Sequence, residues 1–263
     1  MHPMLNTAIT AARKGGDIIS RYADRVDQLN IKEKEQSDYV SQVDEMAEQA
    51  IIDTIHTAYR DHSILAEESG HKKTDSAFEW VIDPLDGTTN YLYGIPHYGV
   101  SIALKRDGKL YQSVIYNPTN GDLFTASKGQ GATLNNRRIR VSGRSSIKNA
   151  LLVTGIPYKT NQDMNLYLET LKTLVPQTAG VRRPGAACLD LAYVAAGRYD
   201  GFWEFGLSEW DIAAGVLLVQ EAGGLVGDFQ TGDTYMQTGD IVAASPKVFR
   251  DMIKRLHPIV KDA

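Results

Sequence analysis

The segment from residue 98 to residue 142 constrains the fold more than any other part of this sequence. Apolar and polar residues alternate along it. The alternation is interrupted by the turn pairs Asp107-Gly108, Asn120-Gly121 and Asn135-Asn136. A period of two is typical of strands, and such residue pairs favour tight hairpin turns. We therefore predict an antiparallel sheet of consecutive hairpins in this segment.

The pattern differs on the two sides of this segment. Before it, apolar spacing indicates helices at residues 4–24 and about 42–60, and short apolar runs indicate strands at 63–68 and 79–84. After about residue 147, strands and helices alternate. We expect strands at 150–155, 199–205, 225–229 and 241–244, and helices at 162–174, 188–198, 210–224 and 246–256.

These patterns indicate an α/β fold class with two lobes. We predict an α+β N-terminal lobe over residues 1–145, which carries the antiparallel sheet and most candidate metal ligands. An α/β C-terminal lobe over residues 146–263 would complete the active site. The boundary is soft, near residues 143–148, and no flexible linker marks it. The lobes are therefore expected to pack as a single compact unit.

The composition argues against several classes of function. A formal net charge of −4 gives no general reason to expect nucleic-acid binding, so an anionic substrate would need local positive charge, which metal ions could supply. Cys188 is the single cysteine, which excludes an internal disulfide and fits a reducing compartment. There is no secretory signal and no apolar run near the ~20 residues that span a bilayer. We expect a cytoplasmic protein that does not enter a membrane.

The stretch WVIDPLDGTTNY, residues 80–91, places Asp83 and Asp86 at the end of an apolar run. Glu67-Glu68 and Asp211 stand at comparable places in two other segments. If folding brings these acids together, they repel each other, and burying them unpaired costs several kcal/mol each. No lysine or arginine lies within VIDPLDGTTN or WDIAAG to balance them. An all-oxygen ligand set favours Mg²⁺ or Mn²⁺.

Each acid also has a plain structural interpretation. Asp86 or Thr88 could cap the start of a helix, and Asp83 could simply end a strand. The acids of the other two segments could be a helix N-cap and an exposed loop pair. Their joint occurrence favours the cation site.

The longest of these motifs, DPLDGTTNY, resembles a signature of the inositol monophosphatase family of Mg²⁺-dependent, lithium-sensitive phosphatases. AEESG upstream and EWDIAAGVLLVQEAGG downstream resemble the same family, and the resemblance runs from about residue 4 to residue 255. MHPMLN, DHSILAEESG, LDLAYVAAGR and TGDIVAASP look closest to the bacterial branch represented by SuhB. The resemblance implies the layered αβαβα sandwich of inositol monophosphatases and sugar phosphatases. It also suggests a homodimer.

The resemblance implies that five residues bind metal ions. Glu67, Asp83 and the main-chain carbonyl of Leu85 would hold a first Mg²⁺ ion. Asp83, Asp86 and Asp211 would hold a second, with room for a third near Glu67 and with Mn²⁺ as a substitute.

The same resemblance implies in-line hydrolysis without a phosphoenzyme. Glu67 and Thr88 would orient the attacking water, and Asp44 would support the Thr88 hydroxyl. The second ion would stabilise the leaving alkoxide. Main-chain N–H groups of Gly87 and Thr88 would bind the phosphate. The substrate's hydroxyls would meet Asp86, Gly185, Ala187 and Glu204.

The expected function is a Mg²⁺-dependent phosphomonoesterase that acts on myo-inositol monophosphate or a related polyol or sugar phosphate. Fructose bisphosphate, nucleotide 3′-phosphates and histidinol phosphate are rival substrates. The alternative implied by the SuhB branch is a partner protein of RNA polymerase and Nus factors in transcription antitermination, with phosphatase activity secondary. Direct DNA binding is not expected.

Three places depart from the family pattern, and the mildest is Ser41, which stands where threonine is usual and keeps the hydroxyl. Ala186 follows Gly185 where serine or threonine is usual, which removes one hydroxyl contact. Glu209 stands in LSEWD where close bacterial relatives have an Arg-Pro pair, and we expect it to add negative charge beside the site or at an interface. These changes bear on substrate preference rather than on metal binding.

The remaining signals are interpreted as structural. The basic residues between 137 and 148, and the pair Arg182-Arg183, are taken as a solvated face, with contact to RNA or an acidic partner as the alternative. His97 is interpreted as structural, with no second ligand beside it.

Overall fold

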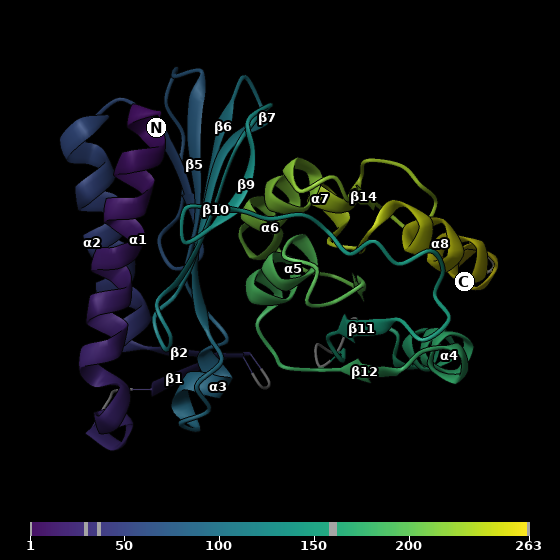
Figure 1. The fold of residues 1–263 in the computed structure, drawn as a ribbon. Coiled ribbons are helices and arrows are strands. Elements are labelled where there is room, and N and C mark those ends of the chain that lie inside the picture. The colour runs from purple at the N-terminus through teal and green to yellow at the C-terminus, as the bar shows by residue number, and fades with distance from the viewer. Residues whose placement is uncertain (1, 29–30, 36–37, 158–161, 262–263) are drawn as a thin grey trace.

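The chain folds into alternating layers of helix and sheet, as Figure 1 shows. The computed structural model describes residues 2–28, 31–35, 38–157 and 162–261. Across the molecule, the layers are a helix pair, a large sheet, a second helix pair, a smaller sheet and an outer helix pair. This is the αβαβα sandwich expected from the sequence, and the α/β fold class is confirmed.

The first layer consists of α1 (Pro3–Tyr22) and α2 (Gln42–Ala58), which pack on each other and on one face of the large sheet. The large sheet has eight strands in the order β10-β9-β8-β7-β6-β5-β3-β4. Their bounds are β3 (Ser63–Ala66), β4 (Gly70–Lys72), β5 (Phe78–Asp86), β6 (Gly99–Arg106), β7 (Lys109–Asn117), β8 (Asp122–Ser127), β9 (Gly131–Leu134) and β10 (Arg137–Arg138).

The hairpin segment forms five consecutive antiparallel strands of this sheet, as predicted. Strands β6 to β10 pair consecutively and antiparallel, whereas β3 lies parallel to β5. Along β6 the alternation separates two cores. Val100, Ile102 and Leu104 pack in the core under α1 and α2, while Ala103 packs in the core on the opposite face.

The middle layer consists of α5 (Ala187–Ala195) and α6 (Glu209–Glu221). Every residue of α6 from Ile212 to Val219 is buried, so this helix is apolar on all sides. A helix of that composition requires cover on all its faces. Its position between the two sheets provides that cover, as Figure 1 shows.

The second sheet and its outer helices complete the chain. The strand order is β12-β11-β13-β15-β14, with β12, β11 and β13 parallel and the other pairs antiparallel. Bounds are β11 (Leu151–Thr154), β12 (Gly180–Arg182), β13 (Gly201–Glu204), β14 (Leu225–Gly227), β15 (Ile241–Ala244), α4 (Met164–Leu174) and α8 (Pro246–Lys261). Short elements are α3 (Thr88–Leu92), α7 (Tyr235–Thr238), η1 (Ala23–Gln28) and η2 (Val175–Gln177).

The structure differs from the sequence-based expectation in a few elements. The hairpin β1 (Ile31–Glu35) and β2 (Asp38–Ser41) and the short strand β12 were not expected. The helix predicted at 210–224 ends at Glu221, because Gly223 takes a left-handed φ of 87°. The proposed lobe boundary at 145/146 lies between the last strand of the large sheet and the first of the smaller one. Within the described residues, no helix is both long and apolar enough to cross a bilayer.

Candidate active site

The end of β5 is irregular where the carboxylate motif begins. The register of the β5–β6 pair shifts between Asp83 and Asp86. Pro84 lies in this irregular part, where the missing N–H costs no ladder hydrogen bond. A bulge bends the strand and redirects its side chains. Leu85 N–H then donates to Asp83 Oδ1 at 3.0 Å, which fixes the turn.

A cavity of about 250 Å³ opens at this point, between the end of β5 and the segments around Gly185, Glu204 and Asp211. All but one of the predicted site residues line it, although they come from five separate segments. They are Glu67, Asp83, Leu85, Asp86, Gly87, Thr88, Gly185, Ala187, Glu204 and Asp211. The remaining predicted residue, Asp44, lies behind Thr88. Folding therefore brings these residues to one place, and their individual roles stay predictions.

Asp83 is an almost fully buried acid of the cavity, with 2 % of its surface exposed. Burial raises the pKa of Asp83 well above its ordinary value, and the neighbouring charges of Glu67, Asp86 and Asp211 raise it further. The acids are therefore close enough to repel one another. A cation bound among them would remove that repulsion.

Glu67 lies in the turn after β3, and its N–H donates to the Ile82 carbonyl at 3.2 Å. The buried carboxylate of Glu48, in α2, accepts the N–H groups of the next two residues, Glu68 and Ser69, at 2.8 Å each. Glu48 thus holds the turn that carries Glu67. Glu48 was not among the predicted site residues, although it follows Asp44 by four residues and so shares its helix face.

Asp44 supports the cavity from the start of α2. Its Oδ2 accepts hydrogen bonds from Ser41 N at 2.9 Å and Ser41 Oγ at 2.6 Å, which caps the helix. Its Oδ1 accepts the hydroxyl of Thr88 at 3.1 Å. The contact expected between Asp44 and Thr88 is present. Burial raises the pKa of Asp44, while the hydrogen bonds from Ser41 and Thr88 lower it, and the net shift is upward.

The turn between Asp86 and Thr88 approaches the loop at Gly185 and Ala186 closely. Gly87 has a φ of 97°, and a Cβ there would lie 3.1 Å from the His97 carbonyl and 3.2 Å from the Gly185 carbonyl. Glycine is therefore required both for the backbone conformation and for space. The expected helix starts at Thr88, as α3, with Gly87 at its N-cap.

Two side chains fasten this turn to the start of α5. Asp86 Oδ2 accepts the N–H of Cys188 at 2.6 Å. Burial raises the pKa of Asp86 to about 6, although the hydrogen bonds from Cys188 and Ala187 lower it. The amide of Asn90 donates to the carbonyls of Pro184 and His97, both at 2.8 Å. Asn90 lines the cavity and was not among the predicted residues.

Asp211 is the third residue of α6 rather than its N-cap. Ser208 occupies the N-cap, and its N–H donates to Asp211 Oδ2 at 2.7 Å. The purely structural interpretation of Asp211 as a cap residue is thus partly correct. Asp211 nevertheless lines the cavity and contributes to raising the pKa of Asp83.

Glu204 and Arg183 line another part of the cavity. Burial raises the pKa of Glu204 to about 8, with further contributions from Asp211 and Asp86, and Arg183 partly opposes them. Gly155 lies so close that a Cβ there would overlap the Glu204 carboxylate. Among the described residues that line the cavity, Arg183 is the sole cation. Its guanidinium is exposed, as expected of a solvated face, yet it belongs to the site.

His97 has a neighbour that the sequence analysis did not foresee. Its Nε2 lies 3.9 Å from Asp190 Oδ1, and neither atom has a hydrogen-bond partner. Asp190 is buried in α5 and lines the cavity. The other basic residues at 137–148 are exposed, in agreement with their interpretation as a solvated face.

The acids share one cavity without forming a closed cage. Within the part of the chain that the structure describes, no three His, Cys, Asp or Glu side chains are spaced to hold a metal ion as they stand. The predicted first site includes a main-chain carbonyl, that of Leu85, which such side-chain groups do not contain. The predicted second site, at Asp83, Asp86 and Asp211, consists of side chains alone and is not among such groups as the structure stands. The donors present are nonetheless all oxygens, which suits Mg²⁺.

The comparisons with known proteins agree with this architecture. A profile of the inositol monophosphatase family matches residues 1–261. The Nus factor SuhB of Pseudomonas aeruginosa is 53 % identical over 263 residues, covering 98 % of this chain and 97 % of that protein. The crystal structure of the extragenic suppressor protein SuhB from Bartonella henselae has a TM-score of 0.94 and 42 % identity, covering 97 % of this chain and 98 % of that one.

Another similar structure belongs to a protein named inositol monophosphatase. The inositol monophosphatase of Anabaena has a TM-score of 0.83 and 37 % identity, and the match covers 97 % of this chain and 95 % of that chain. The resemblance inferred from the DPLDGTTNY motif is thereby confirmed. The chain belongs to the inositol monophosphatase family, a family of phosphatases.

Proposed function

We propose that this chain is an inositol-1-monophosphatase-type hydrolase, which converts myo-inositol monophosphate or a related polyol or sugar phosphate to alcohol and inorganic phosphate. One observation supports this most strongly: the predicted metal ligands and the predicted hydroxyl-binding residue Glu204 line the same small cavity. At about 250 Å³ it lies below the roughly 300–1,000 Å³ of drug-sized ligand pockets, which favours a small substrate.

The family is generally metal-dependent, and the donor set fits a hard cation. We propose two Mg²⁺ sites, one at Glu67, Asp83 and the Leu85 carbonyl and one at Asp83, Asp86 and Asp211. Mn²⁺ would substitute, a third ion would find room near Glu67, and Li⁺ would inhibit. When bound, the ions would lower the pKa of water and offset charge on the leaving oxygen.

Thr88 would orient the attacking water together with Glu67. The Thr88 hydroxyl lies 3.1 Å from both Asp44 Oδ1 and the Leu85 carbonyl, so its proton is engaged by acceptors on the protein. Its lone pairs are then directed elsewhere and can accept a hydrogen bond from water. Asp44 would act as a positioning residue for this hydroxyl.

The rest of the cavity would bind the substrate. The N–H groups of Gly87 and Thr88, at the open start of α3, suit the phosphate oxygens. Glu204 suits a vicinal diol, because a carboxylate accepts two hydroxyl donors. Asp86 and the loop from Gly185 to Ala187 would contact the remaining hydroxyls.

The test combines a substrate panel with one variant. At fixed Mg²⁺, with and without Li⁺, phosphate release is measured from inositol monophosphate, fructose bisphosphate, a nucleotide 3′-phosphate and histidinol phosphate. We expect Li⁺-sensitive release, fastest with inositol monophosphate, and loss of release in Asp83→Asn with an unchanged circular dichroism spectrum. Wild-type turnover in Asp83→Asn would refute the site assignment.

A second candidate function rests on the similarity to proteins named Nus factor SuhB, at 53 % identity in Pseudomonas aeruginosa and 48 % in Escherichia coli. The chain would then bind RNA polymerase or Nus factors, and phosphatase activity would be secondary. The exposed basic residues at 137–148 offer a surface for such a contact. We also propose a homodimer, which light scattering would detect.

A pull-down with purified RNA polymerase and Nus factors at moderate salt tests this second function. Retention that survives in Asp83→Asn would separate binding from hydrolysis. No retention of any of these proteins would contradict it.

A further inference from the structure

The first turn of α6, which carries Asp211, is fastened to strand β6 by two polar side chains. Ser101 Oγ donates to the Trp210 carbonyl at 3.1 Å, and Lys105 Nζ lies 2.5 Å from Glu209 Oε1. Ser101 and Lys105 point to the same side of β6, because side chains along a strand alternate between its faces. The two residues before Asp211, Glu209 and Trp210, are therefore each bound to a side chain of β6.

Strand β6 also supports the other end of the acid cluster. In the β5–β6 pairing, Ser101 is the direct partner of Asp83. Strand β6 thus contacts both Asp83, on β5, and the turn that carries Asp211, on α6. Asp83 and Asp211 come from different lobes, so their spacing depends on how firmly α6 is tied to the large sheet.

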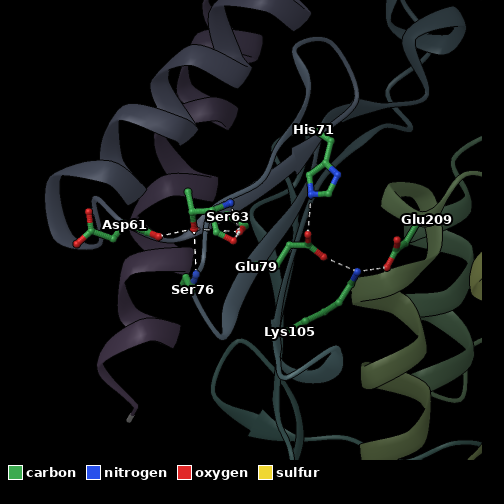
Figure 2. Close-up of polar contacts among 8 residues, drawn as sticks. Asp61, Ser63, His71, Ser76, Glu79, Lys105 and Glu209 are labelled. Carbon is green, nitrogen blue, oxygen red and sulfur yellow. Dashed lines mark hydrogen bonds and ion pairs between the residues drawn. The ribbon is translucent and has the colours of Figure 1, made fainter.

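Lys105 bridges two carboxylates at the interface between the sheet and α6, as Figure 2 shows. Its Nζ lies 2.7 Å from Glu79 Oε2 on β5, and its side chain is 13 % exposed. Burial lowers the pKa of Lys105, but the hydrogen bonds and charges of Glu209 and Glu79 outweigh it and raise the pKa. His71 Nε2 lies 2.8 Å from the other oxygen of Glu79 and completes the chain.

The ion pair with Lys105 changes the interpretation of Glu209. From the sequence we expected it to add negative charge beside the site or at an interface. In the structure its carboxylate is paired with Lys105, so much of that charge is balanced. What the pair adds instead is a fixed position for the helix start.

We propose that Lys105 is a positioning residue, which holds the first turn of α6 so that Asp211 can share a cation with Asp83. The proposal rests on the proposed function, because it takes Asp211 as a metal ligand. Partners behind the ligands of a metal site commonly change its affinity by about 10–100-fold.

A positioning role and a purely electrostatic role of Lys105 predict opposite effects of Lys105→Met on cation binding. Lys105→Met removes a positive charge near the acids, which by Coulomb's law alone would tighten the binding of a cation. If Lys105 acts by position, the same change weakens cation binding. Ser101→Ala loosens the other contact without altering any charge, and it is expected to weaken binding in the same direction.

The experiment measures Mg²⁺ affinity by isothermal titration calorimetry, with the thermal midpoint of each variant recorded alongside. We expect Kd for Mg²⁺ to rise by about 10-fold in Lys105→Met and to stay near the wild-type value in Lys105→Arg. The matched control is Glu79→Gln, which breaks the bridge on the strand side and leaves Lys105 paired with Glu209. It should lower the thermal midpoint and leave Kd unchanged.

Three results would overturn the proposal, and a fourth would refute the metal site on which it rests. Folded Lys105→Met with unchanged or tighter Mg²⁺ binding overturns the proposal, as does Glu79→Gln with an equal loss of affinity. Should Lys105→Met not fold, unchanged affinity in Ser101→Ala overturns it instead. Equal Mg²⁺ binding by the wild type and Asp83→Asn would refute the metal site itself, which separates that failure from a failure at Lys105.

Discussion

Two helices of this molecule begin with the same local arrangement and use it differently. In α2 and in α6 a serine occupies the N-cap, and an aspartate three residues later accepts its main-chain N–H. In α2 that aspartate, Asp44, lies behind the cavity and accepts the Thr88 hydroxyl. In α6 it is Asp211, which lines the cavity beside other acids.

The difference shows that a capping aspartate can have a second role. One oxygen of Asp44 caps the helix while the other holds a hydroxyl. Asp211 contributes to the charge that raises the pKa of Asp83. The local motif explains why both helices start where they do. What each aspartate does beyond that depends on the neighbours that the tertiary fold supplies.

The largest expected effect separates the two aspartates by activity. Asp211→Asn keeps an oxygen to cap α6 but weakens a proposed cation ligand, and the ion supplies several kcal/mol in the transition state. We expect phosphate release to fall on the order of 10²–10⁴-fold. Asp44→Asn should reduce kcat less, because it changes a contact behind the reacting groups. If Asp211→Asn and Asp44→Asn lose the same fraction of kcat at saturating Mg²⁺, the two aspartates do not differ in role as proposed.

A smaller effect is expected at the hydroxyl that Asp44 holds. Thr88→Val removes the group that would orient the attacking water, and we expect kcat to fall about 10²-fold, as for loss of a proton-transfer group. Thr88→Ser keeps the hydroxyl between Asp44 and the Leu85 carbonyl and should retain most activity. If valine and serine behave alike in steady-state kinetics, the hydroxyl has no part in the reaction.

Cation binding should also appear as stability. At ten times its Kd, a ligand that binds the folded chain alone adds about 1.4 kcal/mol, or roughly 3–5 °C in the thermal midpoint. We expect Mg²⁺ to produce this shift in the wild type and in Asp44→Asn, and EDTA to reverse it. In Asp211→Asn the shift should shrink. Differential scanning calorimetry measures these shifts. A full shift in Asp211→Asn would mean that the ion does not bind at Asp211.

The sequence was sufficient for the parts of the site that are local. Asp83, Pro84 and Asp86 are close in the chain, so the turn and the helix start after it follow from residue types alone. The hairpins of the large sheet were predictable for the same reason, because alternation and turn pairs are local signals. Asp211 was a candidate because it stands at the start of an apolar helix, and the family resemblance then supplied its role and the distant residue Glu204.

The rest depends on contacts between distant segments. Nothing near Lys105 in the sequence indicates Glu209 as its partner, since strand register and helix position together create that pair. Glu48 was missed because its partners are the main-chain N–H groups of a turn 20 and 21 residues away. Asn90 was passed over because its acceptors are main-chain carbonyls of another segment. Almost every residue type carries a main-chain N–H and a carbonyl, so residue identity does not reveal which main-chain groups will be hydrogen-bond partners.

The smallest expected effect concerns a carboxylate that only closes a loop. Asp228 accepts the N–H groups of Gln230 and Gly232 and the hydroxyl of Thr234. Burial raises the pKa of Asp228, but these hydrogen bonds outweigh it and lower the pKa below 3.8. Between the two values the unfolded chain binds more protons, so this stabilisation is full above 3.8 and is lost as the pH falls through the folded pKa.

We therefore expect Asp228→Asn to lower the free energy of unfolding by about 1 kcal/mol at pH 7 and by less near pH 3. Urea unfolding at both pH values measures this difference. Phosphate release at pH 7 should match the wild type, because Asp228 does not line the cavity. A deficit that is equal at both pH values would mean that packing, rather than the charged hydrogen bonds, stabilises the loop. A loss of turnover would show that Asp228 supports the reaction from behind the cavity, which is the role proposed for Asp44.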